Sequence, residues 1–171
     1  MAGQVVGRGV DDGVTVGPMI DQAAIDKIDE LVSDAVDKGA KVVVGGRARE
    51  GAGFFYEPTV LAGVSGDAVL RRTEIFGPVA PVSVFDDEDE AVAAANDTEF
   101  GLVAYVYTRE LNRALRVCER LETGMVGLNQ GVVSNPAAPF GGVKASGLGR
   151  EGGRIGIEEF LEVKYVGLPR P

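Results

Sequence analysis

The chain has 171 residues and a net charge of -9, because 26 acidic residues outnumber 17 basic ones. This length fits one domain with a sizeable core, and an acidic chain without a basic cluster is a poor match for nucleic acid. With no histidine and one cysteine, the chain cannot form an internal disulfide, a His/Cys zinc site, or a Ser-His or Cys-His dyad.

No apolar run reaches the roughly 18 residues of a membrane span. Residues 1–12 also lack the basic start and the apolar stretch of a signal peptide. We therefore expect a cytoplasmic protein with a small-molecule ligand and no metal, nucleic-acid or membrane partner.

The first half of the chain predicts a helix followed by strands. Between Asp21 and Lys38 apolar residues recur at helical spacing, and Gly39 supplies a stop. The apolar stripe consists of Ile25, Ile28, Leu31, Val32, Ala35 and Val36. The apolar run at 41–44 predicts a buried strand, and residues 56–61 and 79–85 predict two more.

The second half predicts a strand-helix-strand unit. Asp87 and Glu90 have the spacing of a capping box, which starts a helix over residues 88–95. A strand at 102–107, a helix at 110–122 and a strand at 125–128 then follow in the order that pairs strands in parallel. The chain is therefore an α/β protein, and we find no linker that divides it.

Cys118 could be proposed as a nucleophile, but its neighbours favour a structural role. It shares one helix face with Leu111, Leu115 and Leu121, and a cysteine in such a stripe behaves as a small buried hydrophobe. We predict that Cys118 is buried and unreactive.

Residues 129–153 show no periodicity and are rich in glycine, which favours a functional loop. Gly147, Gly149 and Gly152 match the dinucleotide pattern G-x-G-x-x-G. We reject this reading, because a strand should enter the pattern, a helix should leave it, and an acidic residue should follow about 20 positions later.

The end of the chain alternates apolar and charged residues over positions 160–166. This pattern predicts a strand with Leu161, Val163 and Tyr165 on one face. An exposed strand edge readily recruits a neighbour, so we expect this strand to pair with another chain.

Two blocks carry a family resemblance. Residues 139–153 read PFGGVKASGLGREGG, and residues 73–79 read TEIFGPV. The glycine-rich block resembles the motif near the C-terminus of aldehyde dehydrogenases, and the second block lies at a fitting distance upstream. From residues 11–18 to the last strand, the chain is similar to the C-terminal third of such an enzyme, with the succinate-semialdehyde type as the closest match.

The resemblance implies a three-layer fold with a mostly parallel sheet and flanking helices. Residues 1–157 would form part of the catalytic domain, and residues 158–171 an oligomerisation strand and tail in a homo-oligomer. The implied reaction is oxidation of a semialdehyde to the acid with NAD or NADP, in which a cysteine thiolate attacks the aldehyde and a glutamate activates water.

The resemblance also assigns four binding residues. Glu74 and Phe76 would contact the nicotinamide end of the cofactor. Without the resemblance, Glu74 would be interpreted as a solvated acid and Phe76 as a core aromatic. Ser134 would bind the far carboxylate of the substrate, and Phe140 would line the aldehyde tunnel. A loop serine is otherwise usually just solvated.

The family's catalytic cysteine and glutamate, and its cofactor domain, have no counterpart among these residues. We therefore expect no catalytic residue in this chain and no activity from the chain alone. The alternative is a noncatalytic fragment or scaffold, from a truncated or split gene, that acts through association with another chain. An unrelated α/β binding protein would need both blocks to have arisen by chance.

Overall fold

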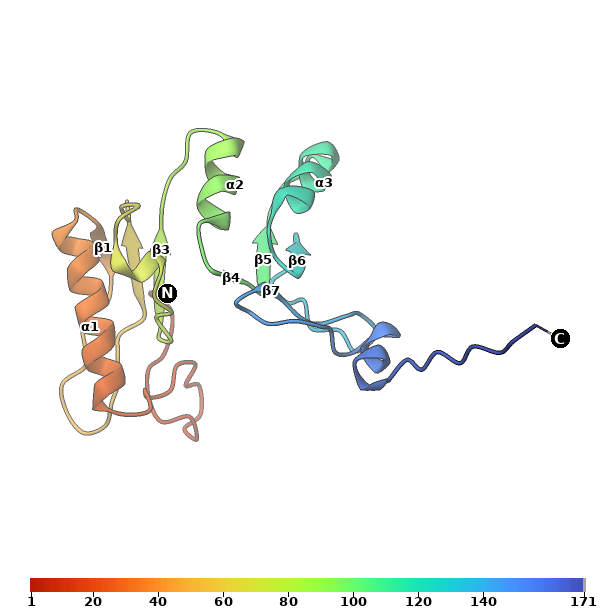
Figure 1. The fold of residues 1–171 in the computed structure, drawn as a ribbon. Helices are drawn as coiled ribbons and strands as arrows, with labels where there is room; N and C mark the ends of the chain where they lie inside the picture. The colour runs from red at the N-terminus through yellow and green to blue at the C-terminus, as the bar shows by residue number, and fades with distance from the viewer. Residues whose placement is uncertain (171) are drawn as a thin grey trace. The chain divides into compact units, whose positions relative to one another are not determined.

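The computed structural model describes residues 1–170. The chain divides into two compact units, Met1–Val84 and Phe85–Pro171, where the sequence predicted one domain. Each unit has its own helices and strands (Figure 1).

The first unit packs one helix against a three-stranded sheet. Its helix α1 spans Gln22–Asp37, and the strands β1 (Lys41–Val44), β2 (Thr59–Ala62) and β3 (Val79–Val82) lie in the order β1-β2-β3. Strands β1 and β2 are antiparallel, and β2 and β3 are parallel. A 3₁₀ helix, η1 (Val69–Arg71), connects β2 to β3.

The predicted stripe of α1 forms the core of this unit. Asp21 caps the helix by accepting a hydrogen bond from the Ala24 amide at 2.9 Å. The buried cluster consists of Ile25, Ile28, Leu31, Val32, Ala35, Ala40, Tyr56, Leu61, Val64, Ala68 and Leu70. Val36 was predicted in the stripe but is 41% exposed.

The strand at 41–44 was predicted correctly in place but not in burial. Val42 is 44% exposed and Val43 66% exposed, because β1 is an edge strand that pairs only with β2. A run of apolar residues therefore did not distinguish a central strand from an edge strand here.

The second unit contains the predicted strand-helix-strand motif. Strand β5 (Val103–Val106) pairs in parallel with β6 (Met125–Leu128), and helix α3 (Leu111–Arg120) connects them. Helix α2 (Glu88–Asn96) precedes the motif, with Asp87 accepting from the Glu90 amide at 2.9 Å as its cap. The short strands β4 (Phe100–Gly101) and β7 (Val143–Lys144) are antiparallel, and a 3₁₀ helix, η2 (Ile155–Phe160), follows.

The predicted burial of one face of α3 was wrong in detail. Leu111 and Leu115 of α3 are 69% and 62% exposed, and Cys118 is half-buried rather than buried. In both units together, parallel and antiparallel strand pairs are equally frequent among residues 1–170.

The predicted terminal strand is not formed. After η2, residues 161–170 are exposed and belong to no strand, and Figure 1 shows them leading away from η2 as an extended chain. A strand requires a neighbouring strand for its backbone hydrogen bonds, and the described part of the chain offers none to this segment. Within residues 1–170, no helix has both the length and the apolarity to cross a membrane.

Candidate functional site

Glu74 and Phe76 project from a loop whose middle residue is anchored. Ile75 packs against the core of the first unit, whereas Glu74 is exposed and Phe76 is 77% exposed. Phe76 adopts a left-handed backbone with φ of +51°, which is a strained conformation for a residue with a bulky side chain. The loop therefore presents a carboxylate and an aromatic ring to solvent.

Helix α1 holds this loop in place. The Lys27 ammonium donates to the backbone carbonyl of Glu74 at 2.6 Å. Gly77 packs directly on the Ile28 side chain, which would have to shift to admit a Cβ atom. Neither contact was foreseen from the sequence, because both join residues far apart in the chain.

Ser134 and Phe140 lie together in the second unit. They line one hollow of about 380 Å³, whose walls are Ser134, Asn135, Pro136, Ala138, Phe140, Glu151 and Gly152. Ser134 is exposed and Phe140 is half-buried. The structure thus brings together the two residues to which the sequence assigned substrate contacts.

Backbone hydrogen bonds shape this hollow. Phe140 and Glu151 exchange two of them, at 2.7 and 2.8 Å, as an isolated antiparallel bridge. The Asn135 side chain accepts from the Ala137 amide at 2.9 Å, and the Gly153 amide donates to the Pro136 carbonyl at 3.0 Å. The long loop predicted at 129–153 therefore has backbone hydrogen bonds of its own, and it also contains strand β7.

A second hollow of about 380 Å³ shares Ser134 with the first. Its walls are Gly124, Met125, Val126, Gln130, Val132, Val133, Ser134, Asn135, Ala138 and Pro139. These residues carry no charged side chain, whereas Glu151 contributes a carboxylate to the first hollow. An anionic ligand group at Ser134 therefore meets less electrostatic repulsion on the side of the second hollow.

The basic residue nearest in sequence to this site is already engaged. The Arg150 guanidinium donates to the backbone carbonyls of Gly142 and Gly149 at 2.7 and 2.6 Å. It holds the loop and is absent from the walls of both hollows. Neither Arg150 nor Glu151 was predicted from the sequence to be a site residue.

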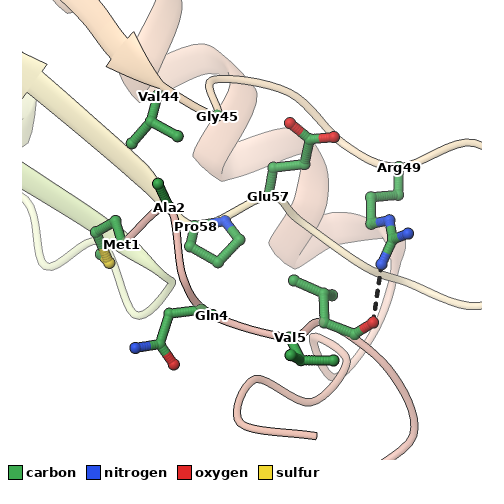
Figure 2. A pocket seen from close by; sticks show the side chains of 10 residues that line it. Met1, Ala2, Gln4, Val5, Val44, Gly45, Arg49, Glu57 and Pro58 are labelled. Atoms are coloured by element: carbon green, nitrogen blue, oxygen red, sulfur yellow. Dashed lines mark hydrogen bonds between the residues drawn. The ribbon is translucent and has the colours of Figure 1, made fainter.

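A further hollow of about 400 Å³ lies in the first unit beside Gly45 (Figure 2). Its two charged side chains already have partners: Arg49 donates to the Val6 carbonyl at 2.9 Å, and Glu57 pairs with Arg47 at 3.4 Å. The first residues of the chain here pack against residues 44–58. In residues 1–170, no group of three His, Cys, Asp or Glu side chains is placed to hold a metal ion.

The profile of the aldehyde dehydrogenase family matches residues 1–166. The chain belongs to the aldehyde dehydrogenase family. Succinate-semialdehyde dehydrogenase [NADP(+)] of Escherichia coli K12 is 55% identical over 161 residues, which cover 94% of this chain and 33% of that protein. Glutarate-semialdehyde dehydrogenase of Pseudomonas aeruginosa is also 55% identical over 161 residues, with the same coverage.

Solved aldehyde dehydrogenase structures share this fold. The crystal structure of an E. coli NADP-dependent enzyme is 53% identical, with a TM-score of 0.93 over 98% of this chain and 35% of that chain. An aldehyde dehydrogenase from Mycobacterium tuberculosis in complex with NAD+ is 36% identical, with a TM-score of 0.89 over 98% of this chain and 35% of that one. The chain therefore spans about a third of the length of the relatives that it matches.

Proposed function

We propose that this chain is the C-terminal part of an NAD(P)-dependent aldehyde dehydrogenase that oxidises succinate semialdehyde, or a similar semialdehyde, to the acid. The observation that carries the proposal is the common hollow of Ser134 and Phe140. The family resemblance assigns both residues to the substrate. The semialdehyde names of the similar E. coli and P. aeruginosa proteins point to the same substrate class.

In this proposal the Ser134 hydroxyl donates to the far carboxylate of the substrate, and Phe140 contacts its carbon chain. The carboxylate binds on the side of the second hollow, where Gln130 is a further side-chain donor and no acid lines the wall. A hydrogen bond to a charged group is stronger than one between neutral groups. Substrates with a terminal carboxylate are therefore favoured over aliphatic aldehydes.

The residues of the first unit fit one end of a nicotinamide cofactor. An exposed carboxylate accepts hydrogen bonds from ribose hydroxyls, and the free face of an aromatic ring packs against a planar group. Glu74 would supply the first contact and Phe76 the second. When bound, the cofactor accepts the hydride of the oxidation. NAD and NADP both remain candidates, because these two residues do not contact the part that distinguishes them.

The three-layer, mostly parallel sheet is proposed for the complete domain, to which this chain contributes residues 1–157. Residues 158–171 are proposed to form the oligomerisation strand and tail, in a homo-oligomer. The exposed apolar residues Leu161, Val163 and Tyr165 support this assignment, since an apolar segment gains stability when a partner covers it.

We also propose that the 171-residue chain oxidises no aldehyde by itself. Its one cysteine, Cys118, lies on α3 and lines neither hollow at Ser134. The covalent mechanism requires a nucleophile beside the substrate, so the covalent intermediate cannot form without one. The alternative function, a noncatalytic fragment or scaffold that associates with another chain, is favoured only by the exposed tail.

A chimera tests the proposal directly. The C-terminal third of the E. coli succinate-semialdehyde dehydrogenase is replaced by this chain, and reduced nicotinamide is followed with succinate semialdehyde. We expect turnover within the ordinary enzyme range of about 1 to 1,000 s⁻¹ from the chimera and none from the 171-residue chain alone. A correctly folded chimera without activity supports the scaffold alternative.

A Glu74→Gln variant of the chimera tests the cofactor contact. Loss of a hydrogen bond to a charged acceptor should raise the KM for the nicotinamide cofactor by about tenfold or more. The KM for the aldehyde should change little. Glu30→Gln, at an exposed position of α1, is the control. If Glu74→Gln behaves like the control, Glu74 does not contact the cofactor.

A further inference from the structure

Lys144 adopts a left-handed backbone with φ of +55°. The other left-handed residues between positions 139 and 153 are all glycines, namely Gly147, Gly149, Gly152 and Gly153. Glycine enters this conformation freely, whereas a residue with a Cβ atom does so at a cost in free energy. A lysine at such a position therefore indicates that its side chain contributes something that offsets the strain.

The Lys144 ammonium has three acceptors. It donates to the backbone carbonyls of Asn96 at 2.9 Å and Thr98 at 3.2 Å, and it pairs with the Glu122 carboxylate at 2.5 Å. The side chain is 26% exposed. Asn96 is the last residue of α2, where backbone carbonyls lack helical partners and carry partial negative charge. All three ammonium donors are thus satisfied.

Asn96 extends this cluster to the end of α3. Its side-chain amide donates to the Arg120 carbonyl at 2.9 Å and accepts from the Glu122 amide at 2.9 Å. We call Asn96, Glu122 and Lys144 the junction. The junction joins the C-terminal ends of both helices to strand β7.

The junction borders the walls of the hollow from two directions. Glu122 lies three residues before β6, which leads to Ser134. Lys144 lies in β7, and Phe140 lies four residues before it. Gly124 packs so tightly against the Gly141 carbonyl that no Cβ would fit. The start of β6 and the loop of Phe140 are therefore held against each other beside the junction.

We propose that Lys144 is a positioning residue for the hollow that Ser134 and Phe140 line. Its ammonium fixes β7 to the ends of α2 and α3, and this contact sets the place of Phe140 opposite Ser134. The inference rests on the proposed function only for the use of the hollow, because the contacts themselves involve no substrate.

Amide hydrogen exchange of the 171-residue chain tests this role in three variants. Lys144→Met keeps the aliphatic stem without the charge, Lys144→Gly also removes the backbone strain, and Lys144→Arg keeps the charge. We expect the Phe140 and Glu151 amides to exchange about tenfold faster in the Met and Gly variants, and within about threefold of wild type in the Arg variant. Amides of β5 and β6 should stay within about threefold of wild type.

Lys164→Met, in the exposed tail, is the matched control and should exchange as wild type does. The proposal is overturned if Lys144→Met and Lys144→Gly leave the Phe140 and Glu151 amides unchanged. It is also overturned if amides of β5 and β6 accelerate equally, or if both variants unfold, since Lys144 would then stabilise the unit as a whole. The exchange measurement involves no substrate, so its result can be interpreted even if Ser134 does not bind the substrate.

Discussion

Glu88 and Arg116 form a two-pronged ion pair between α2 and α3. The Arg116 Nε and Nη2 atoms donate to the two carboxylate oxygens of Glu88, both at 2.7 Å. This bidentate geometry is the strongest form of the Arg–carboxylate contact. Arg113 and Arg120 approach the same carboxylate at 3.5 Å. The hydrogen bond from Arg116, and then the charges of the three arginines, lower the pKa of Glu88.

This lowered pKa predicts a pH-dependent effect of Glu88→Gln. The folded pKa lies below the ordinary value of 4.5, so the stabilisation is present at neutral pH and is lost as the pH falls through the folded pKa. Wild type should be more stable than Glu88→Gln at pH 7, and this difference in stability should shrink at an acidic pH below the ordinary value of 4.5. Urea titrations followed by far-UV circular dichroism measure this difference. A gap of equal size at both pH values would contradict the assignment.

Tyr56 predicts a contrast between two substitutions. Its side chain is 1% exposed, and its hydroxyl has no hydrogen-bond partner among residues 1–170. Burial raises the pKa of this hydroxyl, and the nearby Asp29 carboxylate raises it further. The hydroxyl and this carboxylate do not form a hydrogen bond of normal geometry. Tyr56→Phe should change the free energy of unfolding by less than about 1 kcal/mol, whereas Tyr56→Ala should cost about 3 to 5 kcal/mol. A large loss in Tyr56→Phe would reveal a partner for the hydroxyl.

Phe76 predicts that glycine is tolerated better than alanine at its position. The backbone φ of +51° strains any residue with a Cβ atom, so Phe76→Gly should be more stable than Phe76→Ala by about 1 kcal/mol. Urea unfolding of the two variants measures the difference. In the chimera both should weaken cofactor binding, because both lack the ring. Equal stability would mean that the loop relaxes out of the left-handed conformation.

The tail predicts association of the chain. Residues 161–170 are exposed and belong to no strand of the described chain, and an extended segment of this kind can join the edge of another copy. Sedimentation velocity of the chain with and without residues 158–171 tests this. A dimer that is lost on truncation supports the pairing. A monomer in both cases rules it out.

Local patterns in the sequence predicted most elements of the fold. The stripe of α1, apart from Val36, and the order β5-α3-β6 were confirmed, because helical periodicity and strand-helix-strand order depend on neighbours in the chain. Burial was predicted less well. Val43 and Leu115 are apolar but exposed, since burial depends on which segments pack on each face.

The residues of the candidate site were predicted through the family resemblance. The contacts that hold these residues in place were not predicted. The family resemblance assigns both Ser134 and Phe140 to the substrate, so their place in one hollow could be expected. Lys27 and Lys144 act through contacts with residues 47 and 48 positions away, and such contacts leave no periodic signal. Lys144 is instead marked by its left-handed backbone, which only the structure shows.

The kinetics of Ser134→Ala in the chimera test the central proposal most directly. The two substrates are succinate semialdehyde and butanal, which has the same chain length and a methyl group in place of the carboxylate. Loss of a charge-assisted hydrogen bond should lower kcat/KM for succinate semialdehyde about ten- to a hundredfold, and that for butanal less than about threefold. Ser33→Ala, at an exposed position of α1, should change neither value. Equal losses on both substrates would contradict a contact between Ser134 and the carboxylate.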